Sequence, residues 1–317
     1  MEKIKKTNII WDKKDLLGLE ELSAGEIELI LKTAISFKEI SERSIKKVPA
    51  LRGKTIAHLF LEPSTRTRIS FELAAKRLSA DTIGISGSGS SILKGETMRD
   101  TAQNIEAMKV DMIILRHSAS GSAHILAKNL KAGVINAGDG CHEHPTQALL
   151  DMFTIKEKLG AIKGKKVSII GDIKHSRVAR SNIIGLCKLG AEVTVCAPKT
   201  LMPIEIEKMG CKRTYSLEEA MRSADVINVL RLQKERQKKG LLPTIREYIE
   251  EYGVTLQKVE KFCKKNIVIM HPGPINRGIE MSQDVADSDK AVILEQVTNG
   301  IAIRMAVMFL LSQYKQK

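Results

Sequence analysis

The sequence predicts an α/β protein built from two doubly wound parallel-sheet domains. Strand-like apolar runs recur along the chain, helical patterns of ten or more residues separate them, and 43% of the residues are hydrophobic against 28% charged. The runs are 55–61, 82–86, 110–116, 133–136, 166–171, 191–197, 225–230, 267–270 and 291–294. Strands that alternate with helices indicate parallel sheets covered on both faces. A chain of 317 residues has room for two such sheets, one of four strands and one of five.

The boundary between the two domains is expected near residues 140–165. In that region Gly138-Asp139-Gly140 ends a strand loop, and a helix follows from about Pro145. The stretch from Gly160 to Lys166 then leads into the next strand. We find no low-complexity segment or internal repeat that would suggest a different organisation.

The charge balance raises the question of a nucleic-acid partner. The net charge is +14, from 51 Lys and Arg against 37 Asp and Glu. The lysines are spread over several separate segments, and aromatic residues, which make up only 3% of the chain, do not alternate with them. We therefore interpret most of this charge as solvated surface and expect no nucleic-acid partner.

Cysteine usage and hydropathy indicate a cytoplasmic protein. The five cysteines contain no CxxC pair and no metal-like spacing, so we expect no structural disulfide. The basic N-terminus has no apolar run before Trp11, which argues against a signal peptide. The most apolar segment, Ile301 to Leu311, carries Arg304 and is too short to span a bilayer. No membrane role is expected.

The densest polar motif follows the first predicted strand. Ser64, Thr65, Arg66, Thr67 and Arg68 lie in a turn between that strand and a helix whose apolar residues begin near Phe71. Backbone N–H groups at a helix start carry part of the helix dipole and favour an anion. Arginines and hydroxyls add charge-assisted hydrogen bonds of the kind that phosphate accepts. A capped helix with solvated arginines is the simpler alternative, but five such residues in a row favour a phosphoryl-binding turn.

Two further strand ends of the first half carry polar side chains. Arg116 closes the third predicted strand, at the edge where ligands of open α/β sheets bind. His144 and Gln147 lie on the first turn of the following helix, where we expect them to face a carbonyl group and its amino neighbour. Residues 86–91 are rich in Gly and Ser and precede Lys94, which is typical of a linker or of a mobile active-site loop.

A metal site is the competing interpretation of the segment around His144. Cys141, His142 and His144 lie within four residues of one another, but no second cluster in the sequence completes a four-ligand set. We therefore predict that the protein uses no metal, and nothing else in the sequence indicates a cofactor.

The second half repeats the pattern of polar strand ends. Arg177 follows one predicted strand, Arg231 and Gln233 follow another, and His271-Pro272-Gly273-Pro274 follows a third. A dinucleotide site is the alternative, but no G-x-G-x-x-G motif follows the strand before Arg177. Together with the first half, these segments predict a cleft that suits two anionic substrates, one of them phosphorylated. Its predicted cationic lining consists of Arg66, Arg68, Arg116, Arg177 and Arg231.

These motifs together resemble the transcarbamoylase family over nearly the whole chain. The matching pieces, in order, are Ser64-Thr65-Arg66-Thr67-Arg68, Lys94-Gly95-Glu96, Arg116-His117, His144-Pro145-Thr146-Gln147, Arg231-Leu232-Gln233 and His271-Pro272-Gly273-Pro274. The first and fourth pieces are shared with ornithine-specific members. Lys94, Arg231 with Gln233 and the His-Pro-x-Pro loop resemble the aspartate-specific members. Gly273 departs from some of these, which carry Leu.

The resemblance implies a C-terminal helix that returns to the first domain. It implies that residues 1–145 with 297–317 form a carbamoyl-phosphate-binding domain and residues 146–296 an aspartate-binding domain. It also implies a homotrimer in which Ser90 and Lys94 reach into the neighbouring chain's site. Whether a separate regulatory chain or another pyrimidine-pathway enzyme binds the trimer is left open.

The resemblance further implies a role for each site residue. Ser64, Thr65, Arg66 and Thr67 would hold the phosphate of carbamoyl phosphate. Thr67, Arg116 and His144 would polarise the carbamoyl oxygen, and Gln147 with the carbonyls of Pro272 and Gly273 would hold its NH₂ group. Arg177 would bind the α-carboxylate of aspartate, and Arg231 and Gln233 its β-carboxylate. Lys94 would act at the same site from the neighbouring chain.

The implied reaction is carbamoyl transfer from carbamoyl phosphate to the amino group of L-aspartate. Its products are N-carbamoyl-L-aspartate and phosphate, and it is the committed step of de novo pyrimidine biosynthesis. Attack of the amine builds negative charge on the carbamoyl oxygen, which preorganised donors stabilise. The departing phosphate can accept the amine proton. Transfer to another amine such as ornithine, and a non-catalytic anion-binding or nucleic-acid-binding protein, are the alternatives.

Overall fold

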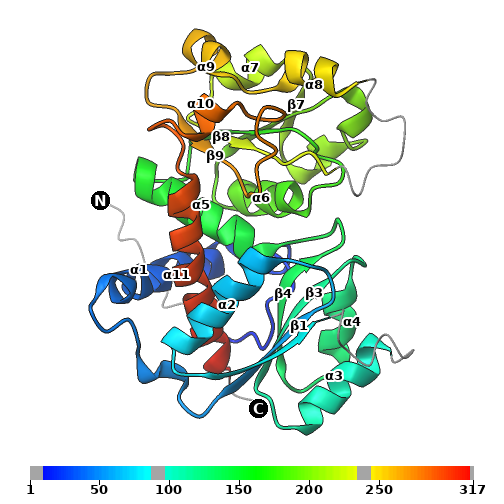
Figure 1. Ribbon diagram of the computed structural model, residues 1–317, viewed down its shortest axis with the longest axis vertical. Coiled ribbons are helices and arrows are strands. Elements are labelled where there is room, and N and C mark those ends of the chain that lie inside the picture. The colour runs from blue at the N-terminus through cyan, green and yellow to red at the C-terminus, as the bar shows by residue number, and fades with distance from the viewer. Residues whose placement is uncertain (1–9, 87–96, 234–243, 315–317) are drawn as a thin grey trace, which may run out of the picture.

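The computed structural model describes residues 10–86, 97–233 and 244–314, and these form two α/β halves stacked along the long axis (Figure 1). The first half contains a four-stranded parallel sheet in the order β2-β1-β3-β4. Its strands are β1 Thr55–Phe60, β2 Asp81–Ser86, β3 Met112–His117 and β4 Gly133–Asp139. Its helices are α1 Ala24–Glu42, α2 Thr65–Arg77, α3 Met98–Ala107 and α4 Ser122–Asn129, with the short 3-10 helix η1 Pro49–Leu51.

The second half contains a five-stranded parallel sheet in the order β7-β6-β5-β8-β9. Its strands are β5 Lys166–Ile170, β6 Glu192–Cys196, β7 Lys212–Thr214, β8 Val226–Val229 and β9 Val268–Met270. Its helices are α6 Arg177–Lys188, η4 Lys199–Leu201, η5 Ile206–Met209, α7 Leu217–Arg222, α8 Ile245–Tyr252, α9 Leu256–Phe262 and α10 Gln283–Ala286. Two longer helices, α5 Pro145–Leu159 and α11 Ile293–Ser312, run between the halves. The predicted fold class is confirmed.

The central strands are apolar because helices cover both faces of each sheet. Along β1, Ile56 and Phe60 pack into the core shared with α1, α2 and α11, whereas Ala57 and Leu59 pack toward α3 and α4. Figure 1 shows these two groups of helices on opposite sides of the first sheet. Such two-sided burial produces the continuous apolar runs from which the strands were predicted.

Two strand assignments differ from the sequence prediction. Residues 291–294 were predicted as a strand, but Ala291 makes only an isolated bridge with Ile269, and α11 begins at Ile293. The strand β7 was missed because Lys212 and Arg213 are exposed and carry no apolar signal. A short polar edge strand takes its hydrogen bonds from the neighbouring β6, so its residues need not be apolar.

The C-terminal helix α11 returns to the first half, as predicted. It packs against α1, α2 and α5 (Figure 1). It is longer than the apolar segment recognised in the sequence, and by length and composition it could cross a membrane. However, 61% of its most apolar stretch is buried inside the protein, and the buried Arg304 donates a hydrogen bond to Ser70 of α2 at 2.8 Å. Helix α11 therefore forms part of the protein core.

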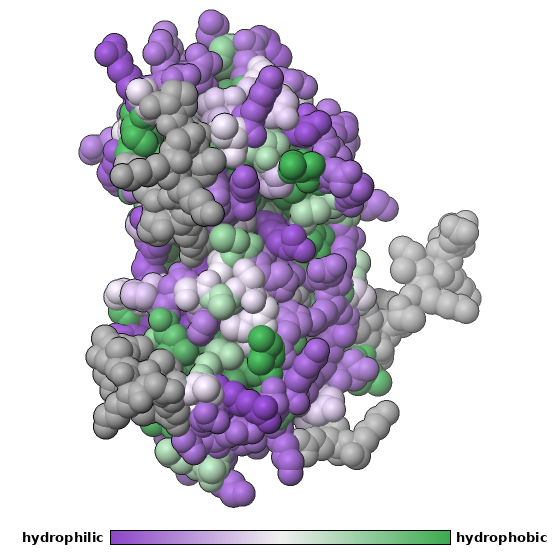
Figure 2. All heavy atoms as spheres, turned by 90° about the vertical axis from the view of Figure 1, so that its right-hand side faces the viewer, coloured by the Kyte–Doolittle hydropathy of each residue, from purple (hydrophilic) through white to green (hydrophobic). Residues whose placement is uncertain are grey.

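The strand orders place both predicted anion sites at topological switch points. In the first sheet the order in which successive strands are added reverses between β1 and β3, and in the second it reverses between β5 and β8. Loops that leave the carboxyl ends of such neighbouring strands diverge and open a crevice for ligands. Ser64–Thr67 follow β1, Arg116 lies at the carboxyl end of β3, and the segments after β5 and β8 carry Arg177 and Arg231. The outer surface seen in Figure 2 is by contrast mainly hydrophilic, with smaller hydrophobic areas.

Candidate active site

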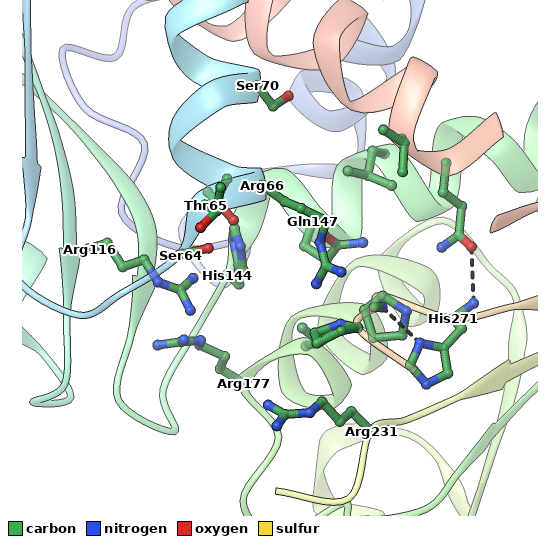
Figure 3. Close-up of a pocket in the computed structure, with 18 of the residues that line it drawn as sticks. Ser64, Thr65, Arg66, Ser70, Arg116, His144, Gln147, Arg177, Arg231 and His271 are labelled. Atoms are coloured by element: carbon green, nitrogen blue, oxygen red, sulfur yellow. Dashed lines mark hydrogen bonds between the residues drawn. The ribbon is translucent and has the colours of Figure 1, made fainter. Parts of the chain in front are cut away.

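A cavity of about 440 Å³ lies between the two halves, where the switch-point loops of both sheets converge (Figure 3). It brings together every described residue to which the family resemblance assigns a role. These are Ser64, Thr65, Arg66, Thr67, Arg116, His144, Gln147, Arg177, Arg231, Gln233, Pro272 and Gly273. Ser90 and Lys94 lie outside the described residues. The cavity is of a size that holds small metabolites.

The phosphoryl-binding turn forms the first turn of α2. Ser64 is the N-cap residue, but its side chain makes no capping hydrogen bond, so the hydroxyl is not needed to complete the helix. The first bond of the helical ladder runs from the N–H of Arg68 to the carbonyl of Ser64. The N–H groups of Thr65, Arg66 and Thr67 precede it and have no carbonyl one turn back. This end of α2 can therefore bind an anion through backbone and hydroxyl donors together.

Arg66 extends from this turn toward the loop after β9. A Cβ atom added to Gly273 would lie 2.9 Å from Nη1 of Arg66, and Gly273 has φ +64°. Glycine at this position thus allows the loop and the guanidinium to approach closely. Partial burial and the neighbouring charge of Arg231 both lower the pKa of Arg66. An anion bound between these two guanidiniums would relieve their mutual repulsion.

Glu62 joins the arginines of the two halves. Its Oε1 accepts from Nη2 of Arg116 at 2.9 Å and from Nη2 of Arg177 at 2.5 Å, and its Oε2 accepts from Nη1 of Arg177 at 2.9 Å. Gly138, with φ +112°, lies against both guanidiniums and leaves room for them. Glu62 therefore fixes Arg116 of β3 and Arg177 of α6 in one cluster. It was not predicted, although a carboxylate directly before the phosphoryl turn was a signal for it.

His144 and Gln147 start helix α5 beside this cluster. The backbone N–H of His144 donates to Oγ of Ser181 at 2.9 Å, and the side chain is 4% exposed. The side-chain NH₂ of Gln147 donates to Asp151 at 3.0 Å. Figure 3 shows His144 and Gln147 near the start of α2, with Arg177 and Arg231 further from it. The arginines and His144 can donate hydrogen bonds to a substrate carbonyl. The side-chain amide of Gln147 lies on the other side.

The loop after β9 is fixed by the side chain of His271. Its Nδ1 accepts from the N–H of Gly273 at 2.8 Å, and its Nε2 faces Oε1 of Glu280 at 3.3 Å. Nε2 is then the protonated nitrogen of the neutral ring. Burial lowers the pKa of His271, which keeps this tautomer at neutral pH. Pro272 and Gly273 are thereby held at the cavity wall.

Arg68 is the one described member of the predicted cationic lining that lies elsewhere. It borders a separate small pocket with His58, Glu72 and Thr82. The reason is helical geometry, because residues two apart on a helix lie on nearly opposite sides. The prediction treated the Arg66 and Arg68 pair as one group, and this was wrong for Arg68.

The turn before His144 meets His124 of α4, which the sequence spacing could not reveal. His124, Asp139 and His142 offer potential ligand atoms that lie within 4.8 Å of one another. Asp139 already accepts from the N–H of Gly121 at 2.7 Å and of Glu143 at 3.1 Å, and its hydrogen bond to His142 raises the pKa of that ring. These bonds give Asp139 a role in holding the turn that carries His144 into the cavity.

Comparison with known proteins identifies the family. Residues 14–157 match the family model described as the carbamoyl-P binding domain of aspartate/ornithine carbamoyltransferase, and residues 163–311 match its Asp/Orn binding domain. The chain belongs to the aspartate/ornithine carbamoyltransferase family. This membership agrees with the transcarbamoylase resemblance of the motifs.

Individual relatives of both substrate classes share the family fold. The aspartate carbamoyltransferase catalytic subunit of Moorella thermoacetica is 60% identical over 299 residues, which are 94% of this chain and 97% of that protein. Ornithine carbamoyltransferase of Pyrococcus furiosus is 33% identical with a TM-score of 0.86, covering 97% of this chain and 100% of that one. Aspartate transcarbamoylase of Trypanosoma cruzi, in complex with carbamoyl aspartate and phosphate, is 29% identical with a TM-score of 0.83, covering 94% and 96%. Because the fold is common to both classes, side chains must decide the substrate.

Replacing Glu62 tests whether the two arginines depend on it. In Glu62→Ala, the guanidiniums of Arg116 and Arg177 lose their common acceptor and move apart. We expect kcat/KM for carbamoyl transfer to fall by about 10- to 100-fold, as for other losses of positioning. The matched control is Glu72→Ala, which removes an exposed carboxylate of α2 that pairs with Lys76. Equal activity of the two variants would contradict the role of Glu62.

Proposed function

We propose that the cavity transfers the carbamoyl group of carbamoyl phosphate to the amino group of L-aspartate. The observation that carries this proposal is the distribution of its cations. A phosphate-binding helix start with Arg66 lies on one side, and Arg177 and Arg231 lie on the side of the second sheet. One phosphate and two carboxylates match these groups. The relative with 60% identity is an aspartate carbamoyltransferase, and this supports aspartate over ornithine as the acceptor.

Each half of the chain would bind one substrate. The proposed division assigns residues 1–145 and 297–317 to carbamoyl phosphate and residues 146–296 to aspartate. In the first part, Ser64, Thr65, Arg66 and Thr67 bind the phosphate. In the second part, Arg177 binds the α-carboxylate, and Arg231 with Gln233 binds the β-carboxylate. Guanidinium groups suit this task because they pair with carboxylates through two parallel hydrogen bonds.

The reaction needs donors where charge develops. When the amine attacks, the carbamoyl oxygen becomes negative, and Thr67, Arg116 and His144 stabilise it. A single preorganised donor of this kind typically contributes about 3–4 kcal/mol to the transition state. Gln147 and the carbonyls of Pro272 and Gly273 accept hydrogen bonds from the carbamoyl NH₂ group. The departing phosphate accepts the amine proton, so no protein base is required.

A homotrimer with shared sites is the assembly that we propose. The segment 87–96 carries Ser90 and Lys94 and follows β2, an edge strand of the first sheet. Beside that edge, Ile83 is 39% exposed, and Ile69 of α2 is 53% exposed. Exposed apolar side chains of this size on β2 and α2 are suited to contact with another chain. A neighbour bound there would receive Ser90 and Lys94 in its own cavity.

Substrate choice can be tested directly by comparing L-aspartate with L-ornithine. We expect transfer to aspartate only, because ornithine would place an ammonium group near Arg231 without an acceptor. Arg231→Ala should raise the KM for aspartate by at least about 100-fold and leave the KM for carbamoyl phosphate within about threefold. Arg213→Ala, which removes an exposed arginine of β7, is the control. Faster transfer to ornithine would refute the assignment.

Shared sites can be tested by mixing inactive chains. Lys94→Ala and Arg66→Ala proteins, dissociated and reassembled together, should regain part of the activity, because one arrangement of neighbours restores a complete site. Arg66→Ala mixed with Arg116→Ala is the control and should stay inactive, since both residues come from one chain. If subunit exchange is demonstrated and the first mixture is as inactive as the control, each chain uses its own lysine.

A further inference from the structure

Asp151 is a fully buried carboxylate one helical turn after Gln147 on α5. Four side-chain NH₂ groups donate to it. Its Oδ1 accepts from Gln147 at 3.0 Å and from Gln296 of α11 at 2.8 Å. Its Oδ2 accepts from Asn182 of α6 at 2.8 Å and from Asn228 of β8 at 3.3 Å. An ionised carboxylate can accept about four such bonds, so these donors fill its capacity.

The charge of Asp151 decides which way the neighbouring amides face. Burial raises the pKa of Asp151 to about 6, so the group is mostly ionised at neutral pH. The buried guanidinium of Arg304 on α11 interacts with this charge. A carboxylate offers only acceptors, and an amide next to it must therefore present its NH₂ group. The oxygen of Gln147 is then directed away from Asp151, and Gln147 lines the cavity.

The same constraint reaches the loop after β9 through Gln296. Because its NH₂ group is bound to Asp151, its oxygen is available to accept from the backbone N–H of His271, at 3.0 Å. The dashed line to the backbone of His271 in Figure 3 marks this bond. His271 begins the loop that carries the carbonyls of Pro272 and Gly273. Asp151 thus connects the two parts of the cavity that present acceptors.

We propose that Asp151 is a positioning residue that makes the cavity select a carbamoyl group over an acyl group. It turns the oxygen of Gln147, and through Gln296 the loop carbonyls, toward the NH₂ group of carbamoyl phosphate. The inference rests on the function proposed above for Gln147 and this loop. Acetyl phosphate carries a methyl group in place of the NH₂, so it would leave these acceptors unpaired. Sites built to hydrogen-bond a substrate NH reject analogues that lack it.

The test compares ligands that differ only at this group. KM for carbamoyl phosphate and inhibition constants for acetyl phosphate and inorganic phosphate are measured on the full-length protein. In Asp151→Leu, which removes both acceptors, we expect KM for carbamoyl phosphate to rise by about 10- to 100-fold. The constants for acetyl phosphate and phosphate should stay within about threefold, because the phosphate-binding turn is unchanged.

Asp151→Asn is the conservative variant and should restore the preference for carbamoyl phosphate over acetyl phosphate. Its single oxygen can accept from Gln147 and Gln296. Its NH₂ group can face Asn182 and Asn228, whose side-chain oxygens have no hydrogen-bond partner within the described part of the chain. Thr154→Val is the structural control. It removes another buried hydrogen bond of α5, the one from Asn299 at 2.9 Å, and should leave the preference unchanged.

Each outcome separates one explanation from another. Parallel weakening of all three ligands in Asp151→Leu, or an unchanged preference, would overturn the positioning role. If Asp151→Leu does not fold, Gln296→Met tests the connection to the loop after β9. The measured quantity is the ratio of the KM for carbamoyl phosphate to the inhibition constant for acetyl phosphate, and an unchanged ratio overturns the proposal. A wild-type protein that does not use carbamoyl phosphate would instead refute the proposed function itself.

Discussion

The structure depends on the convergence of guanidinium groups from two separate sheets. Arg66 and Arg116 come from the first half and Arg177 and Arg231 from the second, and all four line one cavity. Like charges at such distances repel one another unless anions lie between them. Glu62 is the one acidic residue among the described residues that line the cavity, and it binds Arg116 and Arg177. The remaining excess of positive charge favours anionic substrates.

The parallel sheets explain why these residues meet. In each sheet the strand order reverses at one point, and the loops beside that point leave the sheet in opposite directions. Stacking the two halves with their carboxyl edges toward each other turns two crevices into one cavity. Helices α5 and α11 hold this arrangement. Asp151 of α5 accepts from Asn182 and Asn228 of the second half, and Arg304 of α11 donates to Ser70 of the first half. The active-site geometry is thus coupled to the packing between the halves.

Much of this site could be predicted because strand ends carry a local signal. Ser64–Thr67, Arg116 and Arg231 each follow an apolar run directly, and their convergence follows from parallel topology. Relations that depend on three-dimensional packing could not be predicted in this way. Neither the bridge from Glu62 to Arg177, which are 115 residues apart, nor the bond from Gln296 to Asp151, 145 residues apart, has a pattern in the sequence.

The sequence predictions that differ from the structure have equally specific causes. Ala291 to Leu294 are apolar and resemble a strand, yet they form the entry to a buried helix, and short apolar runs do not distinguish the two. Arg68 was grouped with Arg66 by proximity in sequence, although a helix directs them to different sides. His124 approaches Asp139 and His142 only through the fold, so the local spacing that argued against a metal site did not include it.

The central claim is that one cavity holds a phosphoryl group and a dicarboxylate side by side. Calorimetric titration with a single ligand that joins a phosphonate to a dicarboxylate through an amide tests it most directly. We predict that this ligand binds at least about 1,000-fold more tightly than either the phosphonate half or the dicarboxylate half alone, because linking removes the entropic cost of the second binding event. A joined ligand that binds no more tightly than its better half would contradict the account.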